Sequence, residues 1–251
     1  MVQHLYIITG ASRGMGLAMA EQLLSAEHTL LCISRHRHES LSTRADTLGC
    51  SLEQWSMDLE RGVEVADRLA LWLESRPAGS FASATLINNA GILPNIGPLS
   101  ASNPLDLTRA MRVGLEAPLL LTAAFLRATA LWEVPRKVLS ISSGLGRRAM
   151  ASQAAYCAAK AGLDHLTRCL ALEEILKPNG AKVCSLAPGV VDTDMQLHLR
   201  SADAAAFPDQ KNFLDLQSKG QLATPTQAAS RVLAYLARPD FGNNPIGDVR
   251  E

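Results

Sequence analysis

The sequence predicts an α/β fold, a doubly wound parallel sheet with helices on both faces. Short apolar segments alternate with helical segments along the 251-residue chain, and strands that are apolar throughout are typical of parallel sheets covered on both sides. The glycine-rich and polar motifs each follow an apolar segment directly. Ligands bind such sheets beyond the carboxyl ends of the strands, so we expect one domain over residues 1–251 with a ligand site at that edge.

The first half of the chain supplies four expected strands, each followed by a helical segment. The segment HLYIIT, residues 4–9, is a buried-strand run that leads into a glycine-rich turn. The other expected strands are 29–34, 51–57 and 84–91. The expected helices are 16–26, a polar helix from about Glu39, 64–75 and a long region over Leu105–Leu131 that contains Pro118.

The second half repeats the alternation and then departs from it. Strands are expected at 137–142 and 181–189, with a short last strand inside 244–251, and helices at 152–176 and 224–237. Thr224 is a suitable N-cap for the last helix, and Pro225 suits its first turn. The polar segment 192–220 has no regular pattern, and we expect it to form a variable lid over the substrate.

Composition excludes several classes of partner. The chain has 24 Lys and Arg against 24 Asp and Glu, a formal net charge of zero, so it lacks the basic surplus of a nucleic-acid-binding protein. No apolar run approaches the roughly 20 residues of a membrane span. The five cysteines are scattered singly, as is typical of reduced thiols in the cytoplasm. His36 and His38 form an HxH pair, but no carboxylate or cysteine cluster accompanies it, and we expect no metal site.

A glycine-rich turn, TGASRGMG, follows the first strand and opens a helix. Glycines at positions 10, 14 and 16 let the backbone turn tightly and approach a pyrophosphate at the positive end of the helix. The spacing GxxxGxG differs from the usual GxGxxG, and no GK[ST] follows as in a Walker A loop. A purely structural turn remains an alternative for this motif taken alone.

The second strand ends in SRH, where NAD-binding sheets usually carry an acidic residue for the ribose 2′-OH. Arg35, with Arg13 of the glycine-rich turn, suits a 2′-phosphate through charge-assisted pairing. The alternative is a solvated basic loop.

Asp58, after the third strand, can bind an adenine amino group or cap the following helix. Asn88 and Asn89, in the NNAG turn after the fourth strand, can tie neighbouring loops while small residues admit a ligand.

Tyr156 and Lys160, in YCAAK, stand four residues apart, a spacing that places both side chains on one helix face. Tyr156 follows Ser143 by 13 residues. A free phenol has a pKa near 10, and a neighbouring cation favours the phenolate. Tyr156 then becomes a workable general acid or base. A buried tyrosine beside a chance lysine is the alternative.

These motifs together resemble the short-chain dehydrogenase/reductase family over essentially the whole chain. TGASRGMG, NNAG, ISS, YCAAK and APGVVDT occur in the family's order and spacing. The resemblance implies a Rossmann-type domain, NAD(P) chemistry and a catalytic set of Ser143, Tyr156 and Lys160. It also implies cofactor contacts from Thr9, Gly10, Ser12, Arg13, Gly14, Met15, Gly16, Arg35, Asp58, Leu59, Asn89, Ala90, Gly91, Tyr156, Lys160, Pro188, Gly189, Val191 and Thr193.

A narrower likeness lies in the second half, where LINNAG, APGVVDTDMQ and FGNNPIGD are similar to sepiapterin reductases and bacterial benzil reductases. In sepiapterin-type enzymes an Asp near the C-terminus grips the pterin ring, and Asp248 falls at the matching place. A surface Asp near the chain end is the alternative. The family usually has an Asn where this chain has Gly114. In the family, the backbone carbonyl of that Asn holds a water that links the catalytic lysine to solvent. The resemblance therefore implies the catalytic residues in this chain, while the proton relay through such a water stays an open question.

The sequence therefore predicts an NADPH-dependent carbonyl reductase acting on a small-molecule ketone or diketone, with NADP(H) as cofactor. Family likeness also implies a homodimer or homotetramer through the long helices. Two alternatives remain: a non-catalytic NADP(H)-binding regulator, whose mark would be a broken Ser–Tyr–Lys set, and an NAD-dependent alcohol dehydrogenase, against which Arg13 and Arg35 count.

Overall fold

The chain folds around one parallel sheet of seven strands in the order β3-β2-β1-β4-β5-β6-β7. The structure is a computed structural model, and it describes residues 3–251. The strands are β1 Gln3–Thr9, β2 His28–Ser34, β3 Ser51–Ser56, β4 Phe81–Asn88, β5 Arg136–Ile141, β6 Lys182–Ala187 and β7 Ile246–Asp248. The order reverses direction at β1, which lies between β2 and β4. This confirms the predicted doubly wound α/β fold.

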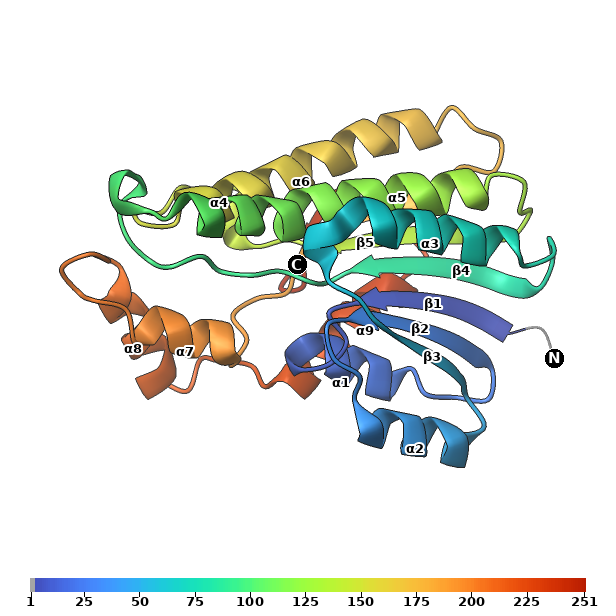
Figure 1. The fold of residues 1–251 in the computed structure, drawn as a ribbon, viewed down its shortest axis with the longest axis horizontal. Coiled ribbons are helices and arrows are strands. Elements are labelled where there is room, and N and C mark those ends of the chain that lie inside the picture. The colour runs from blue at the N-terminus through green and yellow to red at the C-terminus, as the bar shows by residue number, and fades with distance from the viewer. Residues whose placement is uncertain (1–2) are drawn as a thin grey trace.

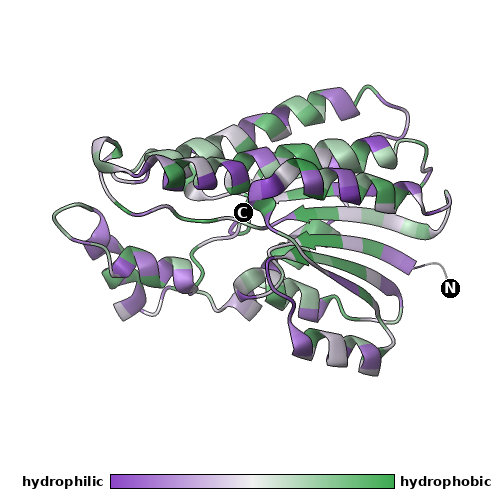
Figure 2. Cartoon of the chain, viewed as in Figure 1, coloured by the Kyte–Doolittle hydropathy of each residue, from purple (hydrophilic) through white to green (hydrophobic). Residues whose placement is uncertain are grey.

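Helices cover both faces of the sheet (Figure 1). One face carries α3 Gly62–Glu74, α4 Pro104–Met111, α5 Ala117–Ala128 and α6 Ala154–Glu174. The other face carries α1 Gly14–Gln22, α2 Glu39–Leu48 and α9 Pro225–Ala237. Two apolar clusters, one against each face, form the core. Figure 2 shows largely apolar strands between helices that carry both polar and apolar residues, as expected for a sheet buried on both faces.

The capping predicted for the last helix is present. The Thr224 side chain accepts from the N–H of Gln227, while the Gln227 side chain accepts from the N–H of Thr224, and Pro225 occupies the first helical position. This reciprocal pairing satisfies two N–H groups that a helix start leaves free. Local sequence therefore determines where α9 begins.

The helical region expected at Leu105–Leu131 is interrupted. Helices α4 and α5 are separated by a π-helical turn at Arg112–Glu116, with Gly114 at its centre. Pro118 lies in the first turn of α5, directly after the π-turn, and has no N–H to donate to that preceding turn. The N–H of Ala117 bonds the carbonyl of Arg112, five residues back, so the π-turn lies directly before the proline, and the glycine within it is itself a poor helix former.

The segment 192–220 is more regular than its sequence indicates. It contains two short helices, α7 Asp194–Arg200 and α8 Gln210–Ser218, which lie beyond the carboxyl ends of the strands, apart from the sheet (Figure 1). A separate apolar cluster of Met150, Leu199, Phe207 and Phe213 holds them together. The sequence did not predict these helices because their apolar residues face this small cluster instead of the main core.

Within residues 3–251, no helix is long and apolar enough to cross a membrane. The same residues contain no group of three or more His, Cys, Asp or Glu side chains placed to hold a metal ion.

Candidate active site

A cleft of about 710 Å³ opens at the carboxyl edge of the sheet. The glycine-rich turn after β1, the ends of β2 to β6 and the start of α6 form its walls, and the segment of α7 and α8 contributes further lining residues, among them Met195, Gln196 and Phe213. We call residues 192–220 the lid from here on. The cleft lies at the switch point of the strand order, where doubly wound sheets bind their ligands.

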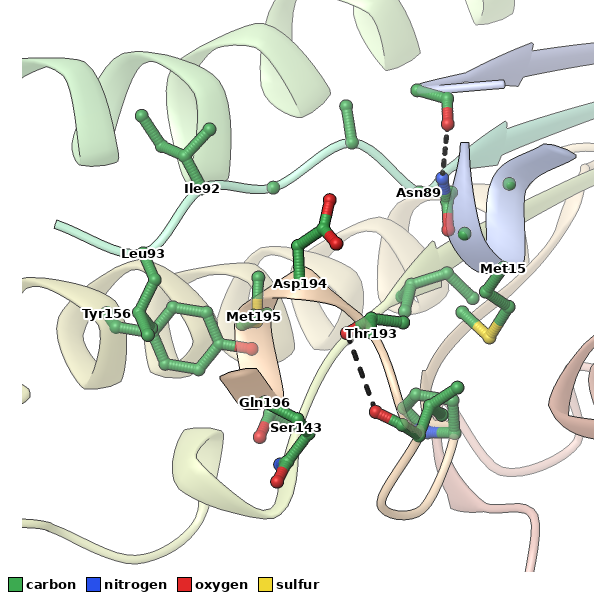
Figure 3. Close-up of a pocket in the computed structure, with 18 of the residues that line it drawn as sticks. Met15, Asn89, Ile92, Leu93, Ser143, Tyr156, Thr193, Asp194, Met195 and Gln196 are labelled. Carbon is green, nitrogen blue, oxygen red and sulfur yellow. Dashed lines mark hydrogen bonds between the residues drawn. The ribbon is translucent and has the colours of Figure 1, made fainter. Parts of the chain in front are cut away.

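The glycine-rich turn is held against β4 by two residues. Thr9 Oγ1 accepts hydrogen bonds from the N–H groups of Asn89 and Ala90, at 2.9 and 3.0 Å. The Asn89 side-chain amide donates to the carbonyl oxygens of Thr9 and Gly10, at 2.8 and 3.3 Å, and Figure 3 draws the second of these bonds. These four bonds fix the turn before α1 while leaving its inner surface free to face the cleft.

The turn has the shape that a pyrophosphate needs. Gly10 and Gly14 have φ of +68° and +56°, a region that favours glycine. A Cβ at Gly16 would lie 2.2 Å from the carbonyl oxygen of Gly10. Only glycine permits this close packing, which presents the N-terminus of α1, with its free N–H groups, to the cleft. The residues present therefore fit the diphosphate of a dinucleotide cofactor.

The end of β2 is basic, as its sequence indicates. Arg35 is exposed and lines the cleft. Arg13 lines it too, but its guanidinium pairs with Asp194 of the lid at 2.6 Å. Both partners of that pair are more than two-thirds exposed, so the bridge stabilises little and a phosphate can replace it. Asp58 both lines the cleft and caps the turn Leu59–Arg61, accepting from the N–H of Glu60 at 3.0 Å.

Ser143, Tyr156 and Lys160 line the same part of the cleft. Ser143 ends the stretch after β5, where its hydroxyl accepts from the N–H of Leu145 at 3.1 Å. Tyr156, on the first turn of α6, points its ring into the cleft (Figure 3). Lys160 is buried; its ammonium lies 5.7 Å from the Tyr156 ring centre and donates to the carbonyl of Ile141 at 2.7 Å.

The two titratable groups are shifted in opposite directions. Burial raises the pKa of Tyr156 to about 12, and the nearby Ser143 hydroxyl opposes this rise. Burial lowers the pKa of Lys160 to about 8, against the attraction of the Asp164 carboxylate one turn further along α6. In the protein alone the phenol of Tyr156 therefore stays protonated. We had expected Lys160 to lower the pKa of Tyr156, but the effect of burial, which removes water from the phenol, is larger than that of the ammonium beside the ring.

The remaining walls are mostly apolar. Leu93, after β4, and Met195, on α7, point into the cleft near Tyr156 (Figure 3). Ile92, Leu145 and Leu199 also contribute to the lining. A carbonyl compound with hydrocarbon substituents would therefore lie between apolar surfaces, with its oxygen toward Ser143 and Tyr156.

The structure brings nearly all predicted site residues to this cleft, with two exceptions. Thr9 is buried behind the turn and acts through its bonds to Asn89 and Ala90. Asp248, at the end of β7, is 5% exposed and is absent from the lining. Its carboxylate accepts from Nε and Nη2 of Arg250, at 2.7 and 2.6 Å, and these bonds lower the pKa of Asp248. Arg250, not Asp248, reaches the cleft.

The polar lining residues that sequence reasoning missed include Gln153, Gln196 and Arg250. Gln153 is the one large polar side chain in the small-residue stretch just before Tyr156, a signal that was present in the sequence. Gln196 lies on α7, which was not predicted. Arg250 lies two residues from the chain end, and only the fold returns it to the cleft.

The profile of the short chain dehydrogenase family matches residues 4–204. A benzil reductase ((S)-benzoin forming) of Bacillus cereus is 33% identical, over 97% of this chain and 96% of the relative. A sepiapterin reductase of Xenopus tropicalis is 32% identical, over 92% of this chain and 90% of the relative.

Solved structures agree in fold. A short-chain dehydrogenase/reductase from Burkholderia vietnamiensis matches with a TM-score of 0.66 and 35% identity, over 100% of this chain and 98% of the other. A structure from Agrobacterium tumefaciens with bound NADP matches with a TM-score of 0.78 and 25% identity, over 98% of this chain and 94% of the other.

Proposed function

Because the chain belongs to the short-chain dehydrogenase family, and is thus an oxidoreductase of the CH–OH/C=O type, we propose that it is an NADPH-dependent reductase of vicinal diketones. The observation that carries the proposal is the meeting of Ser143, Tyr156 and Lys160 in one apolar-walled cleft beside the glycine-rich turn. Such a set handles a single proton and a developing negative charge, which is what carbonyl reduction requires.

Different segments of the chain would bind different parts of the cofactor. The turn at Gly10–Gly16 holds the diphosphate, Asp58 and Asn89–Gly91 face the adenosine and sugars, and the Pro188–Thr193 loop closes the nicotinamide end. The Lys160 ammonium, close to Gly91, is placed to hold a ribose hydroxyl. When bound, the nicotinamide supplies the hydride.

Tyr156 would donate its phenolic proton to the carbonyl oxygen of the substrate. Ser143 would donate a hydrogen bond to the same oxygen as its charge grows, which stabilises the transition state more than the ground state. Lys160, with a pKa of about 8, is protonated at neutral pH and would supply positive charge and return a proton to the tyrosine.

Two substrate classes follow from the relatives' names, an aromatic diketone and a pterin. A pterin would need a free carboxylate, and Asp248 is occupied by Arg250 and lies outside the lining. The apolar walls suit a diketone directly. We therefore favour the diketone, and we expect Asp248→Asn to leave diketone kinetics unchanged.

The preference for NADPH rests on Arg35, which lines the cleft where the 2′-phosphate would lie. We further expect a cytoplasmic homodimer or homotetramer formed through the long helices. The C-terminal part of α6 and the residues just after it expose Leu172, Ile175 and Leu176 by 72, 80 and 83%, which supports an interface there.

Consumption of NADPH with benzil tests the function, and the same assay with NADH tests the cofactor. We expect a higher kcat/KM with NADPH. Arg35→Asp should lower the NADPH preference by the worth of one charge-assisted contact, about 1.5–3 kcal/mol. Equal kcat/KM with both cofactors in the unmodified protein would refute the NADPH preference. Cofactor binding without any turnover would favour a non-catalytic regulator.

A further inference from the structure

Gln153 carries a buried side-chain amide that has no hydrogen-bond partner within residues 3–251. The residue is 1% exposed, and neither Oε1 nor Nε2 is bonded. A primary amide offers two donors and an acceptor, and leaving them unpaired in the interior destabilises the folded state. Gln153 also belongs to the lining of the cleft, so its side chain borders the space in which a ligand would bind.

The backbone holds Gln153 in place from both sides. Its carbonyl accepts from the N–H of Cys157 at 2.9 Å, in the first turn of α6. The preceding Ser152 has φ +63°, and its hydroxyl donates to the carbonyl of Ala206 in the lid at 2.5 Å. The amide is therefore presented at a defined point, three residues before Tyr156 along the chain.

We propose that Gln153 binds the substrate by donating a hydrogen bond to a second oxygen, on the carbon next to the reacting carbonyl. This inference rests on the proposed function. Ser143 and Tyr156 serve the reacting oxygen, so the Gln153 amide is left for another group. Gln153 and Tyr156 both line the cleft from the start of α6, so we place that group on the carbon beside the reacting one.

The chemistry of the amide narrows the substrate class. The second carbonyl of a 1,2-diketone accepts from Nε2. A hydroxyl on the adjacent carbon accepts from Nε2 and also donates to Oε1, so it satisfies both atoms of the amide. The apolar walls at Leu93, Leu145 and Leu199 take the hydrocarbon substituents. The substrate is then an apolar ketone with an oxygen on the neighbouring carbon, and simple monoketones are disfavoured.

The test uses two ketones and two variants. Benzil has two adjacent carbonyls, and 2-phenylacetophenone keeps both rings but has a methylene in place of one carbonyl. Gln153→Met removes the amide at nearly constant volume. Gln22→Met is the matched control: Gln22 joins α1 to α9 away from the cleft, donating to the Thr226 carbonyl at 3.0 Å and accepting from Ser230 Oγ at 2.8 Å.

For Gln153→Met we expect the ratio of kcat/KM for benzil over 2-phenylacetophenone to fall by about tenfold, the worth of one neutral hydrogen bond. The Tm without substrate should equal or exceed that of the unmodified protein, because two unpaired polar atoms are removed. Gln22→Met should lower Tm and leave the ratio unchanged.

An unchanged ratio in Gln153→Met would overturn the inference and leave the proposed function intact. A lowered Tm would overturn it as well, by showing that the amide supports the fold, for instance through an ordered water. Failure of the unmodified protein to reduce either ketone with NADPH or NADH would instead refute the proposed function, and this inference with it.

Discussion

The proposed role of Tyr156 depends on the protonation state of its phenol. Its ring lines the cleft beside Ser143, and burial raises the pKa of its phenol to about 12. A phenol that stays protonated at neutral pH is a ready proton donor to an oxygen that is becoming an alkoxide. In the protein alone the tyrosine is thus poised as an acid, the form that reduction needs.

Tyr156→Phe removes this proton and keeps the ring. We expect kcat to fall nearly to background while NADPH binding, followed by cofactor fluorescence, remains measurable. Ser143→Ala should be less severe and cost a factor of roughly 100 or more, as for loss of one oxyanion donor. Substantial turnover by Tyr156→Phe would mean that another group supplies the proton.

Lys160 should set the pH dependence. Its folded pKa is lowered to about 8 by burial, so the ammonium is present below pH 8 and is lost as the pH rises through that value. The phenol of Tyr156 stays protonated over the same range. We therefore expect kcat/KM for reduction, measured from pH 6 to 10, to fall above about pH 8.

Asp164→Asn provides the control for this profile. The Asp164 carboxylate raises the pKa of Lys160 and accepts from Ser185 Oγ at 2.7 Å. An asparagine keeps an acceptor oxygen and loses the charge, so the fall in kcat/KM should move to lower pH. A profile that is flat to pH 10, or the same in both proteins, would contradict the role of Lys160.

At the scale of elements, the π-turn at Arg112–Glu116 brings the α4–α5 segment against α6. A Cβ at Gly114 would lie 3.0 Å from the Cβ of Ala159, the neighbour of Lys160. Glycine thus permits the closest approach of these helices, and π-turns are often found at functional sites. The backbone carbonyl of Gly114 remains our candidate for holding a relay water.

Gly114→Asn tests whether this position needs a side chain. Because α6 must move by only a few tenths of an ångström, we expect the variant to fold, with a modest loss of Tm, and to stay active. Gly114→Ala has the same Cβ without the amide, so a higher kcat in the Asn variant isolates the amide's contribution. Unfolding of both variants, seen by circular dichroism, would show that close packing is the reason for the glycine and that the relay runs elsewhere.

At the scale of the whole molecule, the cleft is lined by both the glycine-rich turn and the lid. The exposed Arg13–Asp194 pair links the glycine-rich turn to the lid, and the lid has its own small apolar cluster. A cofactor that contacts the turn, the strand ends and the Pro188–Thr193 loop together would stabilise all of them against unfolding.

NADPH at 100 times its Kd should raise the free energy of unfolding by about 2.7 kcal/mol. For a chain of this length that corresponds to a rise in Tm of roughly 5–10 °C, measurable by thermal shift. The same concentration of NADH should raise Tm less, and Arg35→Asp should remove much of the difference. Identical shifts with both cofactors would argue against a 2′-phosphate site at Arg35.

The sequence by itself determined the strand and helix alternation, the glycine-rich turn and the Ser143–Tyr156–Lys160 set. These depend on features that are local in the chain: apolar runs, residues that allow positive φ, caps, and a four-residue spacing that places two side chains on one helix face. A parallel sheet then brings successive strand ends to one edge, so motifs that follow strands meet there whatever the details of packing.

Only the tertiary structure decided which side chains face the cleft. Thr9, expected at the cofactor, is buried behind its turn, and Asp248, at the end of β7, is buried and does not line the cleft. The burial of the Gln153 side chain and the two lid helices depend on contacts between segments that are distant in the sequence. Burial by residues far away in the chain also set the pKa values of Tyr156 and Lys160. Local patterns carry no record of such contacts, because removal of a group from water depends on every segment that surrounds it.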